Sequence, residues 1–208
     1  CRLDPNTGIG DPTPAFTYCL NLAEVEVDTK TGKTTVLKFT CVDFVGRIGN
    51  IDAVNGQAYS GIMHGIGFAL KEDYADVKKH ANMFGAGTSY IKDVPDDINL
   101  IHIDGAISDG PFGSSGASEA FQASGHCAVL NGIYNACGVR IHEIPALPEK
   151  VKAGLDAIAK GEKPYEPKKY FLGSDMYEEL ENIKENPVQV GTQSFYVSLD
   201  DPTAERPF

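Results

Sequence analysis

The sequence is organised around the stretch Gly110-Pro-Phe-Gly-Ser-Ser-Gly-Ala-Ser-Glu-Ala-Phe-Gln122, which separates an alternating apolar run from an apolar helical run. Glycines at this density let backbone N–H groups approach a ligand, because no Cβ stands in the way. N–H groups just ahead of a helix suit an anion. Glu119, the single carboxylate of the stretch, is a candidate general base. The plainer interpretation, a turn followed by a glutamate that complements the helix dipole, remains open on pattern alone.

The residues around this stretch predict a sheet with packed helices. Residues 98–104 form an alternating strand that leads into the loop. Residues 15–28 and 33–46 alternate in the same way on either side of a turn with Gly32, which is typical of a β-hairpin. The apolar positions of the first run change phase once, which suggests a bulge. We therefore expect an α+β fold with a mixed or antiparallel sheet.

A third segment, residues 53–71, carries an apolar stripe at helical spacing. It also contains Gly56, Gly61, Gly65 and Gly67, and glycine inside a helix costs about 1 kcal/mol relative to alanine. Two compensations are equally compatible with the pattern, namely close packing against another backbone or contact with a ligand.

The remaining segments are predicted from capping and breaking residues. Residues 124–137 form a helix capped by Ser124 and closed by Gly138, with Tyr134 on its buried face, and residues 148–160 form the next helix. Residues 73–97 read as an exposed connection with a short strand near Ser89–Ile91. Residues 1–160 are expected to form one domain, and residues 161–208 a surface-wrapping extension that includes a helix at 174–186 and a strand-like run at 195–199.

Two motifs, in the same order, resemble the molybdenum hydroxylases, the family of xanthine oxidase and aldehyde oxidoreductase. The first runs from Gly49-Asn-Ile through Gly56-Gln57 to Glu72, and the second is the central stretch followed by residues 125–148. The sequence Gly116-Ala-Ser-Glu119 stands where the family more often has Gly-Val-Gly-Glu, and Ile51 stands where the family has Pro. The resemblance spans roughly residues 10–187 and is closest to bacterial aldehyde oxidoreductases.

The resemblance implies a function for these residues. Glu119 would be the base in the hydroxylation of an aldehyde, with water as the oxygen source. The cofactor would be molybdopterin with molybdenum, in the cytosine dinucleotide form, and the implied contacts are Gly49, Asn50, Gln57, Gly113, Ser114, Ser115, Gly116, Ala117 and Ser118. No side chain is expected to ligate the metal, and iron–sulfur clusters are expected on other domains or subunits of the same enzyme. The chain alone is expected to be inactive. The alternative is a stand-alone binding or assembly module without the chemistry.

Composition and charge limit the kinds of partner and the cellular compartment that we expect for this chain. A net charge of -11 disfavours nucleic acid, whose phosphates require a basic surface. No apolar run approaches the roughly 18 residues that a membrane span requires. The five cysteines are odd in number and contain no Cys-x-x-Cys pair, so they predict neither zinc nor cluster ligation. Free thiols in apolar runs favour a reducing compartment, and we expect a cytoplasmic location.

Overall fold

A computed structural model of the chain describes residues 3–10, 13, 15–76, 78–162 and 182. The chain divides into two units, Cys1–Glu166 and Pro167–Phe208, and every element described below lies in the first. The predicted helix at 174–186 and strand at 195–199 lie outside the described residues, and the domain division at residue 160 remains a prediction. The elements, in order, are β1 (Tyr18–Val27), β2 (Thr34–Phe44), α1 (Ile51–Leu70), α2 (Met83–Ala86), the 3-10 turn η1 (Ile91–Asp93), β3 (Asp97–His102), the 3-10 turn η2 (Pro111–Gly113), α3 (Ala120–Ala123), α4 (Gly125–Cys137) and α5 (Pro148–Ala159).

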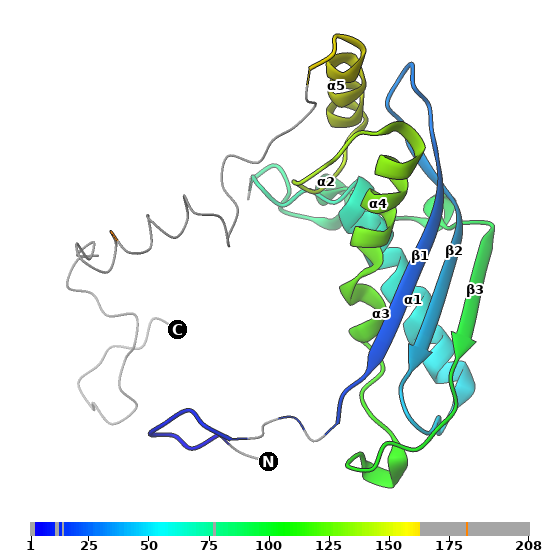
Figure 1. The fold of residues 1–208 in the computed structure, drawn as a ribbon, viewed down its shortest axis with the longest axis vertical. Helices are drawn as coiled ribbons and strands as arrows, with labels where there is room; N and C mark the ends of the chain where they lie inside the picture. Colours follow the sequence, from blue (N-terminus) through cyan, green and yellow to red (C-terminus); the bar gives the residue numbers. More distant parts are fainter. Residues whose placement is uncertain (1–2, 11–12, 14, 77, 163–181, 183–208) are drawn as a thin grey trace. The chain divides into compact units, whose positions relative to one another are not determined.

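The three strands form one mixed sheet in the order β1-β2-β3 (Figure 1). β1 and β2 form the predicted antiparallel hairpin, and β3 runs parallel to β2. A bulge is present, but it lies on β2 and not in the first strand, where it was predicted. Glu24 pairs with Lys38 and Val25 pairs with Val36, so that Leu37 is the extra residue of a bulge. The α+β prediction is therefore confirmed, with the mixed form of the sheet.

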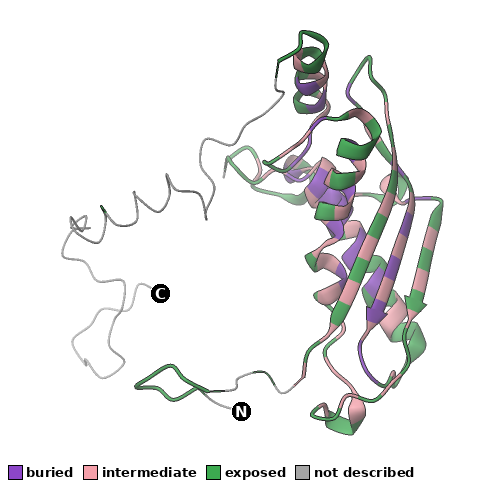
Figure 2. Ribbon diagram, in the orientation of Figure 1, coloured by how far each residue is buried: buried purple, intermediate pink, exposed green. Residues whose placement is uncertain are grey.

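Helices cover one face of this sheet, and the core lies between the two layers (Figures 1 and 2). α4 packs on β1, and α1 packs on α3 and α4. The fully buried side chains come from all of these elements and include Phe39, Cys41, Ile62, Phe121, Val129 and Ile133. The opposite face of the sheet carries the other half of the alternation. Its apolar side chains Leu20 and Ile101 flank Val42 in register, and they are 59% and 44% exposed.

Two of the glycines in α1 are explained by packing. A Cβ on Gly61 would lie 2.7 Å from Phe121 Cβ, and one on Gly65 would lie 2.9 Å from the Cα of Gly125. Both distances are shorter than real Cβ contacts allow, so glycine permits the close approach of α1 to the α3–α4 segment. Here the packing explanation is the right one.

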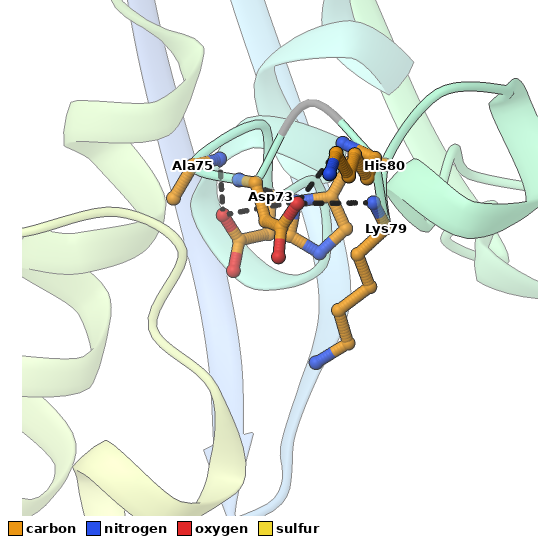
Figure 3. A network of polar contacts seen from close by, with 6 residues as sticks. Asp73, Ala75, Lys79 and His80 are labelled. Carbon is orange, nitrogen blue, oxygen red and sulfur yellow. Dashed lines mark hydrogen bonds and ion pairs between the residues drawn. The ribbon is translucent and has the colours of Figure 1, made fainter.

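The connection after α1 is mostly exposed, as predicted, and is ordered by polar contacts (Figure 3). Asp73 Oδ1 accepts from the backbone N–H of Ala75 at 2.9 Å and lies 3.7 Å from His80 Nδ1. The short strand expected near Ser89–Ile91 is wrong. Asp93 Oδ2 instead accepts from the backbone N–H of Tyr90 at 2.8 Å, which closes the 3-10 turn η1.

α4 and α5 end at the glycines that the sequence predicted, but two other predictions for α4 are wrong. Gly138 and Gly161 take positive φ angles of 77° and 75°, as expected of residues that end helices. Ser124 occupies the N-cap position of α4 but makes no capping hydrogen bond, because its hydroxyl accepts from Asn21 Nδ2 at 3.0 Å. Tyr134 was predicted on the buried face but is exposed. The Arg140 guanidinium stacks over its ring, 3.7 Å from the ring centre. Among the described residues, no helix combines the length and apolarity needed to cross a membrane.

Candidate cofactor-binding and catalytic site

The glycine-rich loop is fixed to the segment that follows β2. The backbone N–H groups of Arg47 and Ile107 both donate to the carbonyl oxygen of Gly113, at 2.8 and 3.0 Å. Gly113 has a φ of 81°, and a Cβ there would lie 2.9 Å from that of Ala106. Gly113 thus has a structural explanation within the chain. Its neighbour Phe112 also has a positive φ, 55°, and is 95% exposed, which is an unusual combination for a bulky residue.

The serine hydroxyls of the loop bond to the protein itself. Ser114 Oγ donates to the carbonyl oxygen of Arg47, and Ser115 Oγ donates to that of Val45 at 3.2 Å. Thr17, just before β1, lies 2.6 Å from Ser115 Oγ and also donates to the carbonyl oxygen of Gly116. These bonds hold the loop in place. Contact of Ser114 and Ser115 with a cofactor stays a prediction.

One hydrogen bond joins the two segments that the sequence had singled out separately. The Ser118 hydroxyl donates to Gln57 Oε1 at 2.7 Å, across 61 residues of chain. Both side chains are exposed, so the bond lies at the surface of the described part. The first two turns of α1 and the glycine-rich loop therefore form one continuous site.

Three glycines of this site have no explanation within the chain. In the described residues, only Gly49, Gly56 and Gly116 combine an ordinary φ with no atom within 4 Å of an added Cβ. Gly56 lies beside Gln57 in α1, and Gly116 lies two residues before Ser118. The space that their missing side chains leave open faces out of the chain, and a cofactor pressed against the backbone would fill it. We call these three glycines, with Gln57 and Ser118, the open cradle.

The start of α1 supplies further polar groups beside the open cradle. Asn50 is the N-cap, and its side chain accepts from the backbone N–H of Ala53 at 3.0 Å. Unpaired N–H groups at a helix N-terminus favour anions such as phosphate. Asp52 in the first turn opposes this preference by its charge. The side-chain oxygen of Asn50 is engaged in this helix cap. The cofactor contact expected of Asn50 stays a prediction.

Glu119 follows directly on the loop. It precedes α3, and its carbonyl oxygen accepts from the N–H groups of Gln122 and Ala123 at 3.1 and 3.0 Å. Its side chain is exposed, and within the described residues it has no hydrogen bond or ion pair. Ala117 is half-buried, and Ser118 lies between it and Glu119. Glu119 thus follows Ser118 of the open cradle in the sequence, and its role as a base stays a prediction.

A buried polar network behind the cradle was not predicted from the sequence. Asp43 ends β2, pairs in register with His102 at the end of β3, and is 1% exposed. His102 Nδ1 lies 2.7 Å from Asp43 Oδ2, and its Nε2 lies 2.7 Å from Asn55 Oδ1 in α1. Burial raises the pKa of Asp43, and the hydrogen bond with His102 offsets part of that rise. The signal in the sequence was weak, since the three residues are far apart and match no motif.

Comparisons with known proteins identify the family of this chain. Residues 2–95 match the family model described as the molybdopterin cofactor-binding domain. Over 154 residues the chain is 45% identical to the aldehyde oxidoreductase of Megalodesulfovibrio gigas, covering 74% of this chain. The chain belongs to the molybdopterin-binding region of the xanthine oxidase and aldehyde oxidoreductase family.

Solved structures support the same assignment. The aldehyde oxidoreductase from Desulfovibrio gigas matches 76% of this chain and 17% of its own, with a TM-score of 0.70 and 44% identity. That from Desulfovibrio desulfuricans covers 65% of this chain and 15% of its own, with a TM-score of 0.64 and 50% identity. The chain spans about 17% of the length of the curated relative from Megalodesulfovibrio gigas.

The residues present fit such a cofactor. The open cradle gives backbone access without side chains, and Gln57 offers an amide that can donate and accept. Within the described ranges no group of three or more His, Cys, Asp or Glu side chains could hold a metal ion.

Proposed function

We propose that the open cradle binds the molybdopterin cofactor of a molybdenum-dependent aldehyde oxidoreductase, with this chain forming part of the enzyme. The observation that carries the proposal is the convergence of two distant segments. The Ser118–Gln57 hydrogen bond joins them, and two of the three unexplained glycines, Gly56 and Gly116, lie within two residues of its partners.

Within this site Glu119 is the proposed general base. The bound cofactor supplies an oxidising metal centre that accepts two electrons from the substrate. The carboxylate of Glu119 takes a proton from the water-derived oxygen that attacks the aldehyde carbon. The proposal is supported by the hydrogen bonds from Ser114 and Ser115 to Arg47 and Val45, which hold the loop that precedes Glu119.

Further features of the enzyme belong to the same proposal. The cofactor is taken to be the cytosine dinucleotide form, whose phosphates suit the N-terminus of α1. Iron–sulfur clusters and the rest of the substrate pocket would lie on other domains or subunits, in a cytoplasmic enzyme. Several relatives are named as aldehyde oxidoreductases, which favours a small aldehyde as substrate. A non-catalytic assembly module with the same fold is the competing possibility.

The test is Glu119→Gln in the complete protein that carries these residues. Glutamine keeps the shape of the side chain but cannot accept a proton near neutral pH. We expect unchanged molybdenum content and a fall in kcat for a good aldehyde of about 10² to 10⁴, the usual contribution of a positioned base. Steady-state turnover per bound molybdenum measures this fall.

The matched control is Glu149→Gln, since Glu149 is also a glutamate at the start of a helix. This variant should keep wild-type turnover. A Glu119→Gln enzyme that keeps its metal and loses less than about tenfold in kcat would rule out general-base work by this residue. Wild-type protein that binds the cofactor but oxidises no aldehyde would favour the non-catalytic module.

A further inference from the structure

The N-terminal part of α1 carries the cradle residues but has little apolar anchorage. The buried residues of this helix begin at Ala58 and continue through Ile62 and Ile66. Before Ala58, only Val54 packs partly against the core. The first two turns, which hold Gly56 and Gln57, therefore depend on other contacts for their position.

Asn55 supplies the strongest of these contacts. Its Oδ1 lies 2.7 Å from His102 Nε2, and His102 Nδ1 lies 2.7 Å from the buried carboxylate of Asp43. The bond thus ties the second turn of α1 to the ends of two neighbouring strands. Asn55 points toward the sheet, whereas Gln57 is exposed and bonds Ser118.

With the Asn55 amide in the orientation that the structure gives, its Oδ1 accepts a hydrogen bond from Nε2–H of His102. If the ring carries its proton on Nδ1 instead, the amide turns over and its Nδ2 donates to Nε2. In both arrangements a partly buried ring nitrogen and a partly buried side-chain amide satisfy each other.

We propose that His102 and Asn55 are positioning residues, which hold the first two turns of α1 so that Gln57 and Gly56 stay in register with the glycine-rich loop. The inference rests on the proposed cofactor site. The network contacts no reacting group, and it acts only through the helix.

The test compares Asn55→Leu, Asn55→Asp and Asn131→Leu in the complete protein. Asn55→Leu removes the acceptor, whereas Asn55→Asp keeps an oxygen for His102. Asn131 is the matched control, because its Oδ1 also accepts a hydrogen bond from a side-chain nitrogen, that of Arg140, at 2.9 Å on an exposed part of α4. The readouts are molybdenum per protein after extended dialysis, turnover per bound molybdenum, and backbone hydrogen exchange of residues 51–57 in cofactor-free protein.

We expect Asn55→Leu to retain about a tenth of the wild-type molybdenum, the loss that an unsatisfied partner of one hydrogen bond typically causes. Exchange in residues 51–57 should rise, while α4 and turnover per bound metal stay within about twofold of wild type. Asn55→Asp should restore retention, and Asn131→Leu should behave as wild type. Equal effects of the two leucine variants, or no rescue by aspartate, would overturn the inference. A wild-type protein without cofactor would instead refute the proposed function, and the hydrogen exchange result would still decide on the network.

Discussion

At the scale of single residues, the sequence left two explanations for the glycines of α1, close backbone packing and contact with a ligand. The structure assigns the first to some of these glycines and leaves space for the second at another. Gly61 and Gly65 face the α3–α4 segment at distances that exclude a Cβ, whereas Gly56 faces open space. Sequence gives the cost of each glycine but not the neighbour that compensates it. The same limit applies to the network of Asp43, His102 and Asn55, because only the fold brings its members together.

Gly65→Ala tests the packing half of this distinction. The added methyl group would lie 2.9 Å from the Cα of Gly125, a backbone atom that cannot move independently. Overpacking of this kind typically costs about 1–3 kcal/mol, which exceeds the gain in helix propensity. Thermal unfolding of the 208-residue chain should show a lower midpoint for the variant. An unchanged or higher midpoint would mean that the two backbones are not in close contact.

At the scale of elements, the sequence predicted the sheet better than the connections. The alternating runs specify the hairpin and β3, because one face of each strand is buried. Their register and the parallel pairing of β3 came only from the structure. The short strand predicted near Ser89–Ile91 failed for a local reason. Asp93 accepts from the N–H of Tyr90 and so favours a turn over an extended backbone.

The same aspartate gives a pH prediction. Burial raises the pKa of Asp93, but hydrogen bonds from Lys71 and Tyr90 outweigh this and hold it below its ordinary value. Because the folded pKa lies below the unfolded value of about 3.9, the stabilisation is present above that pH and is lost as the pH falls through the folded pKa. We expect Asp93→Asn to cost about 1 kcal/mol near pH 6 and much less near pH 3, measured by thermal unfolding across that range. A pH-independent difference between the two proteins would contradict the assignment.

At the scale of the whole molecule, the chain matches only a part of each of its relatives. One face of its sheet carries the exposed apolar residues Leu20, Leu22 and Ile101, an arrangement typical of surfaces that another part of a protein covers. The 154 residues that match the relative from Megalodesulfovibrio gigas make up only 17% of that protein. The open cradle lies at the start of α1, where a cofactor would meet both this chain and residues outside it.

The most direct measurement of the central claim is the molybdenum content of Gly56→Leu in the complete protein. No atom lies within 4 Å of an added Cβ, and leucine favours a helix over glycine by about 1 kcal/mol, so the fold should not be weakened. The account predicts a thermal midpoint for the cofactor-free protein that is equal to or above wild type, together with molybdenum content reduced at least about tenfold, because a well-placed clash with a ligand readily costs the roughly 1.4 kcal/mol that a factor of ten represents. Wild-type molybdenum content in this variant would contradict it, because the space beside Gly56 would then not be where the cofactor binds.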